Sequence, residues 1–429
     1  MAGKGRLASV LLATGRTLLR LHTGLAGPAD RLVAAAERLG EPRAAPWRRF
    51  TQAVLLSRAG DDQAALDHLK AACLALPGEP EVAIALALAF ANADDWERAI
   101  EAGERALKFY EQAAAEQQLW QMLAWGYLIT GRYAHGLDLL QRVRDAGVSP
   151  VPLHLPLLIA QAVTLDRDPP IAEVRALLSR YPRQAEPYWR VIEHLAATQR
   201  SELAVRLLSL LPTTAAIGAA ITIARRAAQR DDAEGVLWAA NALRRLELAP
   251  EVALATAALA ALVAGNDKEA LGYCAEATAL GPDVPLVHER QALVFFITGD
   301  EPRACAAAAA ALSAGSRDAL CAALVATTLA EEGRRREAQA VFRVQRLGDA
   351  LGVVLGHLAQ ARLRAESGDV AEAQRLLAMA LQETANLPAW RRRAAVAQWS
   401  AKQLDRIAEA GSTMEELEKL RSQLVGLGR

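Results

Sequence analysis

The sequence predicts an all-α protein, a solenoid of stacked helix pairs, on three observations. The chain of 429 residues is 52% hydrophobic but only 5% aromatic, and it lacks the alternating Val and Ile runs typical of strands. A small residue returns about every 34 positions, at Ala65, Ala99, Gly136, Ala172, Ala204, Gly235, Ala270, Ala304, Ala338 and Ala373. A turn signal stands five residues before each of these small residues, at Gly60, Asp94, Gly131, Arg167, Gln199, Arg230, Gly265, Gly299, Gly333 and Gly368. A period of this length is typical of helical repeats, whose pairs bury their apolar faces only by stacking.

The N-terminal segment, residues 1–45, lies outside this period. It has no acidic residue before Asp30, and its leucines follow helical spacing, so it reads as a basic amphipathic helix. Such a helix can cap the first repeat, because an open solenoid end exposes apolar surface, or it can lie on an anionic membrane. Both alternatives stay open from the sequence, and the candidate membrane or partner contacts are Lys4, Arg6, Arg16 and Arg20.

The repeated unit is clearest between residues 117 and 150. Apolar residues recur there at helical spacing, then Gly131 ends the first helix and a second amphipathic helix follows up to Pro150. A small residue at the start of each second helix lets the two helices of a pair approach closely. We therefore expect residues 46–385 to form about ten helix pairs.

This pattern resembles the tetratricopeptide repeat. The residues at its signature positions are, in order, Trp120, Leu123, Ala124, Tyr127, Gly131, Tyr133, Gly136 and Leu140. The resemblance covers residues 46–385 and implies a right-handed superhelical solenoid of antiparallel helix pairs whose concave face binds partner proteins. The middle of the array departs from the pattern, because Arg230 stands where the turn glycine is expected and the two shortest steps surround Ala204.

The resemblance also implies which residues form the concave face, namely the second, fifth, ninth and twelfth positions of each first helix. The candidate partner-binding residues are Trp47, Phe50, Ile84, Leu88, Trp125, Leu128, Leu157, Trp189, Leu259, Leu262, Leu293 and Phe296. No Lys or Asn stands at these positions, so a clamp for a peptide carboxylate is not expected. An apolar groove rich in aromatic residues suits an amphipathic or hydrophobic segment. The alternative is that tight winding, or a terminal helix folded back, already buries these residues.

The C-terminal part, residues 386–429, is expected to consist of capping helices. A helix carrying Trp390, Val396 and Trp399 continues the stack, and Ser412 to Glu415 form a capping box that opens a final helix.

No pattern in the chain indicates catalysis. Histidine pairs at metal-ligand spacing, nucleophile elbows and phosphate-binding glycine loops are all lacking, so we expect no metal, no cofactor and no enzyme activity. Basic and acidic residues balance at 49 each, so no nucleic acid is expected as a partner. The longest uncharged apolar stretch, residues 252–265, is too short to span a bilayer, which favours a cytoplasmic protein.

The sequence therefore predicts a cytoplasmic, non-catalytic scaffold or adaptor that binds an apolar or amphipathic partner segment in its concave groove. One alternative is a membrane-surface assembly factor anchored by the N-terminal helix. Another is a structural accessory subunit of an enzyme complex. The identity of the protein partner stays open.

Overall fold

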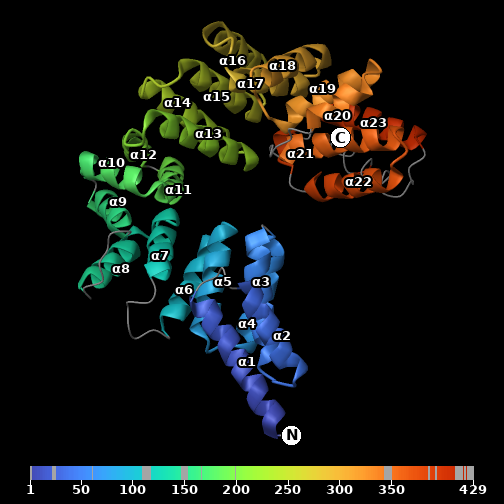
Figure 1. Ribbon diagram of the computed structural model, residues 1–429. Helices are drawn as coiled ribbons and strands as arrows, with labels where there is room; N and C mark the ends of the chain where they lie inside the picture. Colours follow the sequence, from blue (N-terminus) through green and yellow to red (C-terminus); the bar gives the residue numbers. More distant parts are fainter. Residues whose placement is uncertain are drawn as a thin grey trace. The chain divides into compact units, whose positions relative to one another are not determined.

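The computed structural model describes most of the chain (Figure 1). The residues outside the description are 1, 22–25, 60, 109–116, 146–152, 166, 199, 343–349, 385–386, 392–393, 411–418, 420–421 and 423–429. Within the described part every regular element is a helix, and the chain forms two compact units, Met1–Leu210 and Leu211–Arg429. The predicted all-α array of helix pairs is confirmed.

Unit 1 begins with an N-terminal hairpin and continues with five helix pairs. The hairpin is α1 (Ala2–Leu21) with α2 (Ala26–Arg38). The pairs are α3 (Ala44–Ala59) with α4 (Asp62–Ala75), α5 (Pro80–Asn92) with α6 (Trp96–Leu107), α7 (Gln117–Ile129) with α8 (Tyr133–Asp145), α9 (His154–Leu165) with α10 (Ile171–Arg180), and, after a short 3-10 turn at Pro182–Gln184, α11 (Ala185–Ala196) with α12 (Ser201–Leu208).

The described part of unit 2 contains five further pairs and one more long helix after them. The pairs are α13 (Thr213–Gln229) with α14 (Ala233–Arg245), α15 (Pro250–Val263) with α16 (Asp267–Leu280), α17 (Pro285–Ile297) with α18 (Glu301–Ser313), α19 (Ala319–Glu331) with α20 (Arg335–Phe342), and α21 (Ala350–Glu366) with α22 (Val370–Thr384). A 3-10 turn, η5 (Ala389–Arg391), leads into α23 (Ala394–Glu409). In each unit we call the side lined by the first helices of the pairs its inner face.

The periodic small residue has one structural position in the repeat. It is the fourth residue after the N-cap of each second helix, and its N–H donates the first helical hydrogen bond to the carbonyl of the N-cap residue. Ala99 donates in this way to Asp95, and Ala304 donates to Asp300, both at 2.9 Å. Five residues before Ala304, Gly299 has a φ of +88°, a left-handed turn that glycine adopts without steric cost. Eight of the ten predicted anchors occupy this position and are buried.

The remaining two predicted anchors are wrong in register. Ala172 is exposed, and Val174 takes the buried position because Pro170 sets the start of α10. In the next-but-one pair, Val236 is the buried residue rather than Gly235. The left-handed residue of that turn is Asp231 (φ +59°), one position after the expected Arg230. The buried position near the start of each second helix therefore accepts a β-branched residue as well as alanine or glycine.

The N-terminal hairpin packs on the first helix pair. Leu12 of α1 and Val33 of α2 share a core with Trp47 and Phe50 of α3. Arg16 lies 4.3 Å from the centroid of the Trp47 ring and pairs with Glu79 at 2.6 Å. The side chains of Lys4, Arg6 and Arg20 lie outside the described residues.

Helix α23 does not continue the stack. Its principal packing partners are α21 and α17, the first helices of two pairs, so α23 lies across the inner face of unit 2. The expectation that Trp390, Val396 and Trp399 extend the array therefore differs from the structure. The capping box at Ser412 to Glu415 lies outside the described residues.

Candidate functional site

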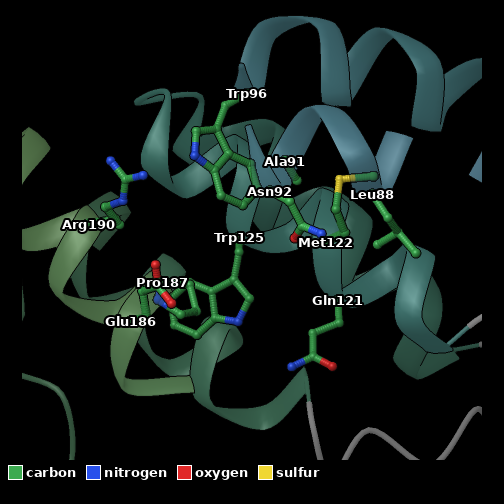
Figure 2. A pocket seen from close by; sticks show the side chains of 10 residues that line it. All are labelled: Leu88, Ala91, Asn92, Trp96, Gln121, Met122, Trp125, Glu186, Pro187 and Arg190. Atoms are coloured by element: carbon green, nitrogen blue, oxygen red, sulfur yellow. The ribbon is translucent and has the colours of Figure 1, made fainter. Parts of the chain in front are cut away.

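The inner face of unit 1 contains a cavity of about 630 Å³ between α5, α7 and α11 (Figure 2). We call it the Trp125 groove. It is lined by Leu88, Ala91, Asn92, Trp96, Gln121, Met122, Trp125, Glu186, Pro187 and Arg190. The mixture of apolar side chains with amide and charged groups at one cavity is typical of sites that hold an apolar ligand and orient it by a few polar contacts.

Trp125 has an unsatisfied hydrogen-bond donor in this groove. The residue is 2% exposed, and its indole Nε1 is buried without a hydrogen-bond partner. In Figure 2 the nitrogen lies on the side of the ring nearer to Gln121. A buried donor without an acceptor is unfavourable, so a small shift of the ring that lets a carbonyl oxygen in the groove reach this nitrogen would gain a hydrogen bond.

One end of the groove is held by a charge pair between segments distant in sequence. The Arg190 guanidinium of α11 binds both carboxylate oxygens of Asp94, one of them at 2.9 Å, and the side chain of Arg190 is only 11% exposed. The Trp96 indole N–H also donates to Asp94, at 2.9 Å. Bidentate pairs of this kind fix orientation, so Asp94 ties α11 to the turn between α5 and α6.

The sequence predicted part of this groove. Leu88 and Trp125 were predicted as inner-face residues, and both line it. No sequence pattern gave a site role to Trp96 or Arg190, and Asp94 was expected only as a turn signal. Asp94 does carry a local clue, because a non-glycine residue at a left-handed turn (φ +65°) in place of the usual glycine points to a role for its side chain.

The other predicted residues of unit 1 differ in how accessible they are. Ile84 and Trp189 are half-buried, and Trp189 stacks beside the Arg190 guanidinium at 5.2 Å. The fully or nearly fully buried ones, which do not line the groove, are Trp47, Phe50, Leu128 and Leu157. Trp47 and Phe50 are covered by the N-terminal hairpin.

The predicted residues of unit 2 are all buried. They are Leu259, Leu262, Leu293 and Phe296. Phe296 meets Trp399 of α23 edge to face, with ring centroids 6.1 Å apart. At this place the inner face of unit 2 is occupied by the chain's own C-terminal helix.

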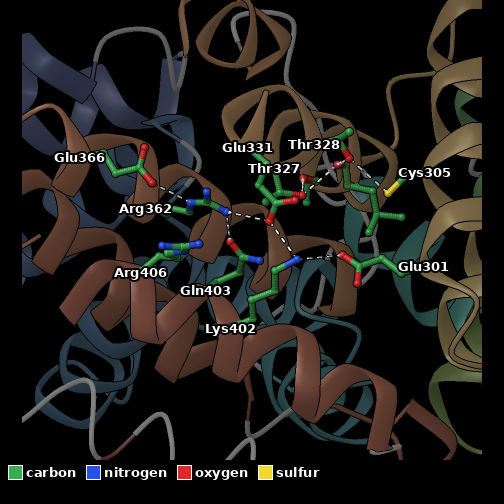
Figure 3. Close-up of polar contacts among 12 residues, drawn as sticks. Glu301, Cys305, Thr327, Thr328, Glu331, Arg362, Glu366, Lys402, Gln403 and Arg406 are labelled. Atoms are coloured by element: carbon green, nitrogen blue, oxygen red, sulfur yellow. Dashed lines mark hydrogen bonds and ion pairs between the residues drawn. The ribbon is translucent and has the colours of Figure 1, made fainter. Parts of the chain in front are cut away.

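A polar network joins α23 to the repeats (Figure 3). Arg362, which is 4% exposed, donates to Gln403 at 2.9 Å and to Glu366 at 2.8 Å. Lys402 pairs with Glu331 at 2.9 Å, and this hydrogen bond raises the pKa of Lys402 above its ordinary value. The lysine therefore stays charged at neutral pH.

The surroundings of the four cysteines disfavour ionisation of their thiols. Cys274 and Cys321 are buried, and Cys73 and Cys305 are half-buried. Burial raises the pKa of Cys274 to about 12 and also raises the pKa of Cys73, Cys305 and Cys321. A thiol with such a pKa is protonated at neutral pH and is a weak nucleophile.

The described part of the chain holds neither a metal-ligand cluster nor a membrane-spanning helix. No three His, Cys, Asp or Glu side chains gather there in a way that could hold a metal ion. None of the helices described is both long and apolar enough to cross a membrane.

No protein-family model matches the chain, and no curated protein sequence matches it. Solved structures do match, at low similarity. Yeast Tom70 is 12% identical, with 95% of this chain and 96% of that chain covered and a TM-score of 0.35. A tetratricopeptide repeat protein from Parabacteroides merdae is 14% identical, with 73% and 98% covered and a TM-score of 0.26. The complex of the TPR2AB domain of yeast Sti1 with pHSP90 is 12% identical, with 70% and 98% covered and a TM-score of 0.24. Likenesses at this level imply neither a partner nor an activity.

Proposed function

We propose that this chain is a non-catalytic protein-interaction scaffold that binds an apolar or amphipathic segment of a partner protein in the Trp125 groove. The observation that carries the proposal is the buried Trp125 indole N–H without an acceptor, at the wall of a cavity of about 630 Å³. A carbonyl group of the partner would accept this hydrogen bond, and an apolar side chain would fill the cavity.

The lining of the groove suits an amphipathic segment. Leu88 and Met122 offer apolar contact, and methionine adapts its shape to different partners. Asn92 and Glu186, both exposed, add polar groups at the margin. Since packed helices hold these side chains in place, little ordering entropy would be lost on binding.

The test begins with a peptide that binds the full-length chain, selected from a displayed library. Trp125→Phe keeps the apolar ring but removes the donor, and it should weaken binding about fivefold, the effect of one net hydrogen bond. Trp125→Ala together with Trp189→Ala should weaken binding at least tenfold, because tryptophan anchors dominate binding energy. Trp238→Phe in unit 2 is the matched control, since its indole nitrogen is also buried without a partner but lies far from the groove in sequence.

Calorimetric titration and urea unfolding separate binding from folding in these variants. The proposal fails if the selected peptides bind all variants equally. It also fails if the double variant unfolds while its folded fraction binds with unchanged affinity, because both tryptophans would then serve only the core.

The N-terminal helix keeps the membrane-surface alternative open. On α1, Leu7 is 52% and Val10 is 59% exposed, which leaves an apolar stripe for a bilayer, although Arg16 is engaged with Glu79. If this alternative holds, the full-length chain floats with anionic liposomes and Leu7→Gln with Val10→Gln abolishes flotation. We otherwise propose α1 as a cap of the first repeat and the cytoplasm as the compartment.

A further inference from the structure

The inner face of unit 2 is already occupied, and the occupant fits it imperfectly. The buried stripe of α23 includes Val396, Leu404 and Ile407, but also three residues with polar atoms. Among the described residues, the Trp399 Nε1, Ser400 Oγ and Gln403 Nε2 atoms are buried without hydrogen-bond partners. Each has given up water without replacing it, which weakens the attachment of α23.

An unfilled cavity and two carboxylates lie beside α23. A cavity of about 720 Å³ remains between α23 and the helices α19, α20 and α21, with Arg335 and Glu366 among its lining residues. Two carboxylates from different pairs, Glu301 and Glu331, converge on one cation of α23, Lys402, at 3.8 and 2.9 Å (Figure 3). The groove therefore favours a helix that presents a cation at this point.

The aromatic contact fixes the register of such a helix. Trp399 packs edge to face on Phe296, and Lys402 follows three positions later, so both side chains lie on one face of α23. Next to Lys402, Gln403 accepts a hydrogen bond from the buried Arg362. A ligand helix would match this surface with an aromatic residue, a cation three positions later and then a hydrogen-bond acceptor.

We propose that the inner face of unit 2 is a second docking groove, specific for an amphipathic helix of a partner protein with this aromatic and basic pattern. In the free chain α23 occupies the groove as an internal ligand, and the partner helix replaces it. The turn η5 stays attached during the exchange, because the backbone N–H groups of Ala389 and Trp390 donate to Asp231 and the Trp390 indole donates to the Ala228 carbonyl at 2.8 Å.

Hydrogen exchange of the wild-type, full-length chain tests whether α23 can leave. The amides of residues 394–409 should exchange at least 100-fold faster than those of α21, because α23 opens locally while the repeats stay folded. Equal protection of α23 and α21 would overturn the proposal, since α23 would then be an integral part of the core.

Binding of a helix in trans tests the recognition. The probe is a fluorescent peptide with the sequence of residues 394–410, and the opened receptor is the full chain with Trp399→Ala and Lys402→Ala. Anisotropy should show at least tenfold tighter binding to the opened variant than to the wild type. A peptide in which Lys402 is replaced by Glu should bind the opened variant at least tenfold more weakly, and Glu301→Lys with Glu331→Lys in the receptor should restore its affinity.

The control separates this groove from the Trp125 groove. Adding Trp125→Ala to the opened variant should leave peptide affinity unchanged, so the two proposals can fail independently. Absence of peptide binding to an opened variant that remains folded would overturn the present one. A concentration-dependent dimer of the opened variant would also overturn it, because the occupant would then be α23 of a second copy.

Discussion

The inner faces of the two units are built from the same repeat but differ in what covers them. In unit 1 the first helices leave the Trp125 groove open beside a salt-bridged turn. In unit 2 the corresponding side carries α23, which packs on α17 and α21 and buries Phe296 under Trp399. A solenoid therefore does not present a uniform groove, since a segment outside the repeat period decides which part of the inner face stays uncovered.

The largest expected effect concerns the closed face of unit 2. Arg362→Ala removes a nearly buried guanidinium from Gln403 and Glu366 and leaves Glu366 only the more distant Arg335, at 3.3 Å, as an ion-pair partner. Breaking a buried ion pair on one side should lower the free energy of unfolding by about 3 kcal/mol. Urea unfolding followed by circular dichroism measures this loss. A loss below about 1 kcal/mol would show that the network does not hold α23 in place.

The second prediction compares two alanines at corresponding points of the sequence period, one from each unit. Ala304→Leu overpacks a buried helix crossing in unit 2 and should cost about 1–3 kcal/mol of unfolding free energy. Ala172→Leu in unit 1 is the matched control, because this alanine is exposed, and should change stability by about 0.5 kcal/mol or less. Equal effects at the two positions would contradict the corrected register at Val174.

The third prediction concerns the ion pair between Arg190 and Asp94 at the Trp125 groove of unit 1. Arg190→Ala removes the bidentate pair with Asp94 and should lower the unfolding free energy by about 1 kcal/mol, less than Arg362→Ala, because Asp94 is partly exposed. It should also increase the hydrogen exchange of α11. Unchanged exchange of α11 in this variant would mean that packing on α12 and α7 positions the helix without this pair.

The smallest effect is a pH dependence expected in both units. Burial lowers the pKa of His194 in unit 1 and of His357 in unit 2 below the ordinary value. The unfolded chain then binds protons at higher pH than the folded chain does. The stability associated with the neutral imidazoles is thus present above about pH 6.5 and is lost as the pH falls toward the folded-state pKa.

Urea midpoints at pH 7.5 and pH 5 measure this effect. His194→Gln should reduce the loss between the two pH values, and the same substitution at the exposed His135 is the control. If His194→Gln and wild type lose stability equally, protonation of His194 is not coupled to unfolding.

The candidate site was only partly predictable, and the residues show why. Leu88 and Trp125 were found because their positions follow from helical periodicity within one repeat. Arg190 was not, because its partner Asp94 is 96 positions away and no local pattern links the two. The burial of Phe296 could be stated only as an alternative, since it depends on a helix about a hundred residues further along the chain.

The sequence by itself determined the all-α fold, the period of the helix pairs and eight of the ten anchors at the helix crossings. These features follow from spacings within about 34 residues, where turns, helical periodicity and small side chains act locally. Only the tertiary structure decided that Val174 and Val236 replace two anchors, that Asp94 holds α11, and that α23 covers the inner face of unit 2. The physical reason is that these outcomes depend on which distant segments bury surface against each other, and many pairings satisfy the same local pattern.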